Sequence, residues 1–310
     1  MTTERRNTNR SAAALLIGAS LGLLPSTTLA LDLYGLSQAG DRLFTLGTSG
    51  TVHNDVSVSG LKPGDSLVDI DVFASGDRRL YGLGTSGTLY TLDPMSGAAT
   101  VNVANAAVGS PTVIDFNPAA DRLRIFSGNG NYRLTPGTGV VSNDGSLVYA
   151  AADANAGAVP NLVAAAYINN VDAPGATTLF SLDAGVDALI RHSGGPQFST
   201  LNTVVPLTLG GLPFDLGQNA GFDVFSPAVG INQAYVSNGN QLFALDLMSG
   251  ILSSLGTVNA SAPLGSIATS VPDDTSTLAL GAVAAAAGMA AFRQRRREGA
   301  EGQVLSSAAA

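Results

Sequence analysis

One short sequence recurs along this chain and restricts the fold more than any other feature. Leu89–Gly97 reads LYTLDPMSG and Leu242–Gly250 reads LFALDLMSG, while LFTLGTSGTV at Leu43–Val52 nearly repeats as LYGLGTSGTL at Leu80–Leu89. Such self-similarity indicates a repeat protein, in which one supersecondary unit is copied along the chain. Each unit then packs on its neighbours, so the domain is expected to be an array of similar units.

The recurring sequence supplies a marker for the third strand of each unit. The marker falls at five positions, with spacings of 37, 42, 48 and 63 residues: His53, Tyr90, Tyr132, Phe180 and Phe243. The last spacing leaves room for one more unit, because Thr203–Leu209 has a strand-like pattern.

One unit can be followed strand by strand. Two of its turns, Asp93–Gly97 and the matching Asp246–Gly250, are predicted to be type I turns closed by a glycine with positive φ. Four antiparallel strands per ~40 residues make one blade of a β-propeller. We therefore predict an all-β propeller of five blades, with six as the alternative; a solenoid would need more uniform repeats, and a sandwich would not repeat its turns so closely. The four strands expected in this unit are Val68–Phe73, Leu80–Gly84, Thr88–Leu92 and Ala99–Val103.

Charge and cysteine content exclude several classes of function. Residues 31–270 contain 18 Asp, no Glu, seven Arg and one Lys, so their net charge is 8 − 18 = −10. An acidic surface repels phosphate backbones, which excludes nucleic acid as an expected partner. The chain has no cysteine, so it has neither disulfides nor thiolate metal sites, and strand pairing and packing must hold the fold.

The first 30 residues have the layout of a secretory signal peptide. Arg5, Arg6 and Arg10 precede an apolar run from Ala12 to Leu24, and small residues follow it. This order predicts export and cleavage after Ala30. A buried first helix is the alternative. A twin-arginine signal fits less well, because Asn-Thr-Asn follows the first arginine pair.

The other end has a three-part layout, which we assign to residues 271–297. A short motif comes first, an apolar stretch from Leu278 to Phe292 follows, and a basic cluster ends it; a polar tail, 298–310, lies beyond. A basic cluster after an apolar segment stays in the cytoplasm, so this end is expected to contact the inner membrane, transiently or as a retained tail anchor. The motif is Val271, Pro272, Asp273 and Asp274, and the cluster is Arg293, Arg295, Arg296 and Arg297.

This end resembles the PEP-CTERM type of sorting signal, and more closely its Val-Pro-Asp variant. The resemblance implies recognition by an exosortase-like transpeptidase after passage through the export machinery, cleavage near Val271–Asp274, and delivery to the cell surface or an extracellular polysaccharide matrix. The chain departs from the pattern at Asp274, where proline or serine is usual, and in carrying the polar tail.

The middle of the chain resembles a family of bacterial domains of unknown function, number 4394. The likeness is carried by Val68–Gly97, by Asp115–Gly139 with its DFNPAADRLRIFS, and by Gly221–Gly250. It covers nearly all of residues 31–268, to which we assign the propeller domain. The resemblance implies a propeller-like fold and no particular activity.

Aspartates recur near the end of the first strand in three units. Asp71, Asp115 and Asp223 would converge on the central axis of a propeller, and Asp69 points to the same side as Asp71. Four oxygen ligands of this kind predict a site for a hard cation such as Ca²⁺. The alternative is structural, with each aspartate capping the turn that follows its strand. No other cofactor is indicated.

The remaining polar residues give weaker signals. His53 occupies a position held elsewhere by aromatics, which predicts packing, and His192 is expected in a turn. A Ser-His-Asp set lacks the Gly-x-Ser-x-Gly context that would support it. Arginines follow Asp41, Asp77 and Asp121 in turns that enter second strands; they form either weak surface pairs or an arginine-rich binding face.

Two functional hypotheses follow. The first is an exported, non-enzymatic binding module that displays loops to a matrix polysaccharide or an envelope protein. The second is an extracellular hydrolase or lyase that uses the axial aspartates, with or without Ca²⁺. The absence of tryptophan argues against a stacked sugar-binding groove, although weaker sugar binding by loops stays open.

Overall fold

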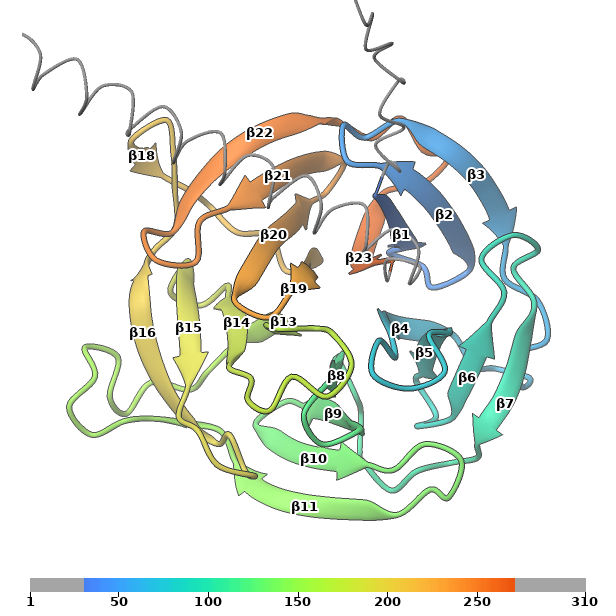
Figure 1. The fold of residues 1–310 in the computed structure, drawn as a ribbon, viewed down its shortest axis with the longest axis horizontal. Coiled ribbons are helices and arrows are strands. Elements are labelled where there is room, and N and C mark those ends of the chain that lie inside the picture. The colour runs from blue at the N-terminus through green and yellow to red at the C-terminus, as the bar shows by residue number, and fades with distance from the viewer. Residues whose placement is uncertain (1–30, 271–310) are drawn as a thin grey trace, which may run out of the picture.

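The computed structural model describes residues 31–270, which form five β-sheets arranged as blades around a central axis (Figure 1). The predicted five-bladed propeller is confirmed. No sixth blade is present among these residues: Thr203–Leu209, the candidate for one, lies in outer strands that belong to the fourth and fifth blades.

The second and third blades are plain four-stranded sheets, each with its strands in chain order from the axis outward. The unit predicted strand by strand is the second blade, and its bounds agree within two residues. The strands of the second blade are β4 (Leu67–Val72), β5 (Leu80–Gly84), β6 (Leu89–Leu92) and β7 (Ala99–Val103). Those of the third blade are β8 (Val113–Asn117), β9 (Arg122–Ser127), β10 (Gly130–Leu134) and β11 (Val141–Ser146).

The fourth and fifth blades carry extra short strands on their outer edges. In the fourth blade, β12 (Val148–Tyr149) pairs in parallel with β16. In the fifth blade, β17 (Thr208–Leu209) pairs in parallel with β22 and antiparallel with β18 (Leu212–Pro213). The main strands are β13 (Leu162–Tyr167), β14 (Leu179–Asp183), β15 (Ala188–His192) and β16 (Thr200–Pro206), then β19 (Ala220–Ala228), β20 (Ile231–Asn238), β21 (Gln241–Leu245) and β22 (Ile251–Thr257).

The first blade joins the two ends of the domain. The last strand, β23 (Leu264–Thr269), is its innermost strand and pairs with β1 (Asp32–Ser37); β2 (Arg42–Gly47) and β3 (Val52–Ser57) follow outward. This closure removes the free ends that an open array would leave. Because the first blade borrows its inner strand, each hairpin in it lies one strand further out than the repeat predicts.

The predicted third-strand markers are therefore wrong at two of five positions. His53 lies in β3, the outermost strand of the first blade, and Phe180 lies in β14, the second strand of the fourth. His53 is also exposed, and its Nδ1 lies 3.3 Å from Oδ1 of Asp32, so the predicted core packing is wrong. Tyr90, Tyr132 and Phe243 lie in third strands as predicted.

The hydrophobic core is divided among the contacts between neighbouring blades. Between the second and third blades, for example, Tyr81 and Phe116 meet edge to face with ring centroids 5.2 Å apart. Similar clusters fill the other four interfaces. Since each blade buries its faces only against its neighbours, the ring must be complete for any blade to be covered on both sides.

The turn from Asp93 to Gly97 shows why its sequence recurs. The Asp93 carboxylate accepts hydrogen bonds from the Met95 N–H (2.9 Å) and the Ser96 hydroxyl (2.6 Å), and Gly97 has a φ of 74°. A Cβ at Gly97 would lie 2.2 Å from the Ser57 carbonyl oxygen, so both the backbone angle and the close approach require glycine. Asp246–Gly250 repeats the arrangement in the fifth blade.

The antiparallel order gives the propeller two distinct faces. We call the face where the first strands begin the upper face, and the face where they end the lower face. Both ends of the domain lie on the lower face, where the Ser270 N–H donates to the Asp32 carbonyl over 2.9 Å.

Residues 31–270 include no helix of the length and apolarity needed to cross a membrane. The predicted signal peptide with its cleavage after Ala30, the sorting motif, the apolar segment and the basic cluster all lie outside the described residues.

Candidate functional site

The first strands of the five blades surround the axis, and their inner edges shape its chemistry. Each first strand pairs with a second strand on one side only, so alternate N–H groups on its other edge have no partner within the sheet (Figure 1). A buried N–H without an acceptor costs about 1–3 kcal/mol, so these groups need acceptors from side chains.

Three buried aspartates provide those acceptors for one complete ring of five N–H groups. Each aspartate is about 2 % exposed, and together their carboxylates accept one N–H from every blade. Asp71 accepts from Val72 (2.7 Å) and Phe116 (2.6 Å), Asp115 from Tyr167 (2.8 Å), and Asp223 from Val224 (2.6 Å) and Thr269 (2.5 Å). Five of the six carboxylate oxygens thus hold a backbone N–H, and we call this arrangement the axial carboxylate ring.

Asp115 accepts one N–H whereas Asp71 and Asp223 each accept two, and this difference follows from two alanines. In the repeat of first strands, Ala166 in β13 and Ala268 in β23 occupy the position that aspartate holds in the other three blades. An aspartate on one blade normally accepts the N–H of the next blade, as Asp115 does for Tyr167. Where the preceding blade carries alanine at this position, no such acceptor is available. The N–H groups of Val72 and Val224 then donate to the second carboxylate oxygen of Asp71 and Asp223, the residues just before them in their own strands.

Asp69 continues the same arrangement one layer closer to the upper face. Its Oδ2 accepts the Ile114 N–H of the third blade over 2.7 Å, and its Oδ1 accepts the Ile70 N–H over 2.9 Å and the hydroxyl of Ser266 in the first blade. Asp69 keeps partial exposure, unlike the three aspartates of the ring.

Burial makes the axial carboxylates weaker acids than usual. Burial, and secondarily the Asp223 carboxylate, raises the pKa of Asp71 well above its usual range, and burial with the charge of Asp71 does the same for Asp115. Burial raises the pKa of Asp223 to about 6 and that of Asp69 to about 7, against the effect of the N–H bonds they accept. Burial therefore favours the protonated form of these carboxyls.

Three of the four aspartates predicted at the axis meet there, and the fourth lies one layer closer to the upper face. One oxygen each from Asp71, Asp115 and Asp223 lies within 4.8 Å of the others, while Asp69 belongs to the next layer. The structural alternative also needs revision, because the ring bonds join N–H groups of the first strands rather than capping the turns that follow them. The sequence could not show this, since the N–H groups that require acceptors become visible only once the five strands are placed.

A polar cavity of about 450 Å³ opens at the centre of the upper face, and we call it the mouth. Residues from all five blades line it, on the loops that enter first strands and on the hairpins between second and third strands. Among the described residues, no charged side chain lines the mouth. Its polar lining consists of amides and hydroxyls: Gln38, Ser66, Thr85, Thr112, Asn161, Gln218 and Asn219.

The amides of the mouth are available to a ligand in different degrees. The Asn161 amide donates to the Gln218 side-chain oxygen over 2.8 Å, and the Gln38 amide donates to the Leu264 carbonyl over 3.2 Å. Gln38, Gln218 and Asn219 are exposed to solvent. Leu67 lines the mouth, and Asp71 stands four residues further along the same strand, about 13 Å deeper. The acidic ring therefore lies well below the mouth.

The structure also places a serine and a histidine together, although not at a surface. Nε2 of His192 lies 2.7 Å from Oγ of Ser181, and Nδ1 of His192 lies 2.7 Å from the Phe198 carbonyl. Because a carbonyl only accepts, Nδ1 carries the proton and Nε2 accepts from the serine. His192 ends strand β15 and is buried, so its predicted place in a turn is wrong, and burial lowers its pKa to about 4. Because the pair is buried, a substrate cannot reach it. The group that orients His192 is a backbone carbonyl and not a carboxylate.

A buried arginine in the third blade carries a second polar network. Arg124 is 1 % exposed and bonds Oδ2 of Asp144 (2.7 Å), the Tyr167 hydroxyl (3.1 Å) and the Asn131 side-chain oxygen (2.7 Å). Arg133 approaches the same carboxylate at 2.6 and 2.8 Å. Sequence reasoning missed this network, because an arginine in DRLRIF has the alternation of an ordinary exposed strand residue.

The three arginine-bearing turns do not all share one face: those at Asp77 and Asp121 enter second strands at the lower face, whereas the turn at Asp41 enters a third strand at the upper face. Arg42 is at the start of β2, a third strand, and lies 2.5 Å from the Asp55 carboxylate. Arg79 is near the start of β5, a second strand, and lies 3.6 Å from the Asp77 carboxylate. These two turns lie on opposite faces of the propeller, because third strands begin at the upper face and second strands at the lower face. The surface-pair interpretation therefore fits them better than a shared arginine-rich face.

Comparison with known proteins gives a family and a set of distant fold similarities. A search of functionally curated proteins finds no match. Among solved structures, a chain of the nidogen/laminin complex is 15 % identical, with a TM-score of 0.41 over 78 % of this chain and 98 % of that one. An auxiliary nutrient binding protein from Bacteroides ovatus is 9 % identical, with a TM-score of 0.41 over 70 % and 54 %. Glutaminyl cyclase from Myxococcus xanthus is 14 % identical, with a TM-score of 0.40 over 75 % and 76 %.

The family assignment rests on the sequence of the propeller itself. The family model described as "Domain of unknown function (DUF4394)" matches residues 42–268, from the start of β2 to β23, the strand that closes the ring. That range is most of the chain and nearly all of the described residues. The chain therefore belongs to the DUF4394 family, whose fold in this member is a five-bladed β-propeller.

Proposed function

We propose that this protein is an exported binding module whose mouth holds a neutral polar ligand, such as a strand of matrix polysaccharide. The observation that carries the proposal is the lining of the mouth, where amides and hydroxyls from five blades converge without a charged side chain. Uncharged donors and acceptors suit hydroxyl-rich or amide-rich ligands. An envelope protein with an exposed polar loop is the other partner that this surface would fit.

The described residues favour binding over catalysis at this site. A general acid or base must come within hydrogen-bond reach of a substrate. The ring carboxylates are about 2 % exposed and already hold N–H groups, and the Ser181–His192 pair is buried within the fourth blade. These groups fit a role in holding the propeller together.

Delivery to the cell surface is the second part of the proposal. The signal-like residues 1–30 and the sorting-like residues 271–297 support export, contact with the inner membrane and recognition by an exosortase-like enzyme. Both ends of the domain leave from the lower face. A domain tethered there would present its mouth away from the tether. The intact mass of the native protein tests this part, since a chain that keeps residues 1–30 would contradict export by cleavage.

Truncating the exposed amides of the mouth is expected to weaken polysaccharide binding about tenfold or more. Gln38→Ala, Gln218→Ala and Asn219→Ala together remove three side chains, each worth about 0.5–1.5 kcal/mol as a hydrogen-bonding partner. Binding is measured by calorimetry or by retention on matrix polysaccharide purified from the source culture. The fold should persist, because all three residues are exposed.

Asn202→Ala is the matched control, since it removes an amide from strand β16, outside the mouth. It should leave the affinity unchanged. Equal affinity of the triple variant and the control for every polysaccharide and envelope fraction tested would remove the mouth from the proposal.

An extracellular hydrolase or lyase is the second candidate function. It is favoured by the three ring carboxylates, whose oxygens lie close enough together to hold a hard cation. Occupation by Ca²⁺ would require those oxygens to exchange some of their N–H bonds for the ion. Titration with calcium in a calorimeter tests this candidate: heat that disappears in Asp115→Asn would support it, and no heat at millimolar calcium would remove the metal.

A further inference from the structure

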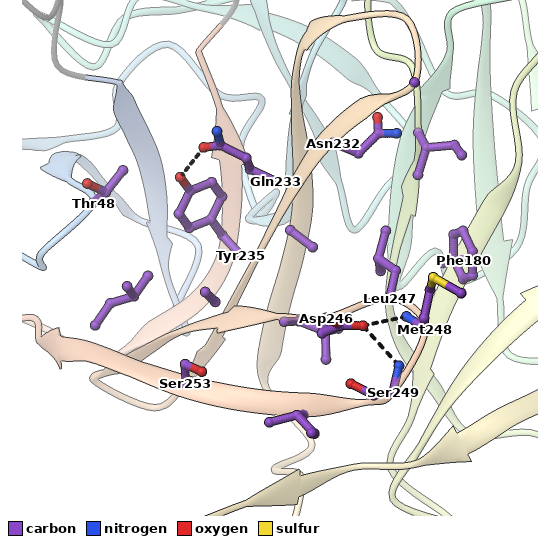
Figure 2. A pocket seen from close by; sticks show the side chains of 17 residues that line it. Thr48, Phe180, Asn232, Gln233, Tyr235, Asp246, Leu247, Met248, Ser249 and Ser253 are labelled. Carbon is purple, nitrogen blue, oxygen red and sulfur yellow. Dashed lines mark hydrogen bonds between the residues drawn. The ribbon is translucent and has the colours of Figure 1, made fainter. Parts of the chain in front are cut away.

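A groove of about 870 Å³ crosses the lower face of the fifth blade (Figure 2). It runs from Thr48, in the connection from β2 to β3, to Phe180 at the start of β14, so it touches three blades. Leu247, Ile251 and Leu255 contribute apolar surface to its lining. Polar groups at its edge are already engaged, as Figure 2 shows for the Asp246 carboxylate, which accepts the Met248 N–H over 2.8 Å.

Exposed apolar side chains gather at the groove. Met248 lines it and is 88 % exposed, and Ile251 is half exposed. Val229, in the connection from β19 to β20, and Ile231, the first residue of β20, lie next to the groove and are also about half exposed. Exposed apolar residues that gather beside a groove mark a surface that binds something apolar.

The chain itself supplies an apolar segment close to this surface. The described chain ends at Ser270 on the lower face of the first blade, and Thr269 is bonded to Asp223 of the fifth blade at 2.5 Å. Forty residues follow, 271–310. Seven of them precede Leu278–Phe292 and can span at most about 24 Å. The apolar segment is thus confined to the neighbourhood of the lower face unless another structure takes it up.

The composition of this segment matches the groove. Leu278–Phe292 contains only apolar residues and glycine, eight of its fifteen residues are alanine, and Arg293 begins the basic cluster directly after it. Small side chains allow close approach to a shallow apolar surface. The net charge of −10 on residues 31–270 attracts the four arginines of the cluster.

We propose that the groove of the fifth blade binds the chain's own C-terminal apolar segment, Leu278–Phe292. Docking shields the segment from water in the uncleaved chain, before the segment enters the membrane. The proposal is independent of what the mouth binds, since the two surfaces lie on opposite faces.

The absence of cysteine allows a direct test in the full-length chain. Met248→Cys is combined with Ala285→Cys, the chain is oxidised in detergent-free buffer, and the disulfide is identified by mass spectrometry of the peptides. Within one chain, this pair is expected to form at least ten times faster than Met95→Cys with Ala285→Cys. Met95 is the matched control, because it sits in the equivalent turn of the second blade and is 70 % exposed, away from the groove.

Three results would overturn the proposal. Equal rates for the two cysteine pairs, or no disulfide in either, would show that the segment does not dock in the groove. A disulfide that forms only between two chains would assign the groove to a second copy instead. Both cysteine positions in the propeller are exposed turn residues, so neither substitution threatens folding.

Discussion

Asp144→Ala is expected to lower the free energy of unfolding by about 3–5 kcal/mol, the largest effect of any single substitution away from the axis. Asp144 is 3 % exposed and is the carboxylate partner of both Arg124 and Arg133. Removing it leaves the guanidinium of Arg124, itself 1 % exposed, without a counter-charge, and an uncompensated buried charge carries a penalty of this size. Urea unfolding, followed by circular dichroism, measures the change.

Asp55→Ala is the control for this prediction. Asp55 also pairs with an arginine at short distance, 2.5 Å from Arg42, but both side chains are about a quarter to a third exposed. A pair of that kind contributes about 0–1 kcal/mol. If the two substitutions cost the same, burial is not what makes the Arg124 network important, and the assignment of that network as a structural centre is wrong.

Raising the pH from about 4 to about 8 in metal-free buffer is expected to destabilise the propeller through its axis. Burial raises the pKa of Asp223 from 3.8 to about 6 and that of Asp69 to about 7, so the folded state holds these protons more tightly than the unfolded state. The stabilisation is complete below the unfolded pKa and is lost as the pH rises through the folded pKa. For Asp223 the difference between the folded and unfolded pKa corresponds to about 3 kcal/mol.

His192 contributes with the opposite sign, which determines the design of the measurement. Its pKa is lowered to about 4, so its contribution increases as the pH rises from about 4 to about 6.5. The pH profile of Asp69→Asn is therefore subtracted from that of the wild type, with a chelator present, because His192 is common to both. The difference should fall with rising pH between about 4 and 7. A flat difference would contradict the raised pKa of Asp69.

Asp246→Asn provides the control of opposite sign. N–H bonds from Met248 and Ser249 lower the pKa of the exposed Asp246, so its small contribution is present at neutral pH and lost in acid. Its difference profile should rise, not fall, between pH 3 and 5.

The sequence indicated the architecture well wherever one blade is contiguous in the chain. In the second blade all four strands were predictable, because strand segments and Gly-containing turns alternate within about forty residues. The first blade was misjudged, since its inner strand comes from Leu264–Thr269, more than 200 residues away. The LF-x-L hairpin recurs in different places within a blade, because it encodes a hairpin rather than a position, and so His53 and Phe180 were assigned to third strands.

The axis was predictable only in part, for a related reason. The recurring aspartates could be placed on first strands, and their convergence follows from the fold. Their partners could not be predicted, because Ala166 and Ala268 carry no chemical signal and the five N–H groups are part of the backbone. The mouth was equally invisible, since Gln38, Asn161 and Gln218 are far apart in sequence and ordinary in local context.

The closure of the ring also determines how the domain would respond to mechanical load. The strand that completes the first blade, β23, is the one that continues into residue 271, so any pull on the C-terminal tether acts first on β23. Such a pull runs along the strand towards the lower face and loads its backbone pairs with β1 in shear, all together rather than one after another. The Thr269–Asp223 bond at the end of β23 shares that load with the fifth blade. A tether at this end would thus draw on the whole ring, and failure of this one strand would open the propeller.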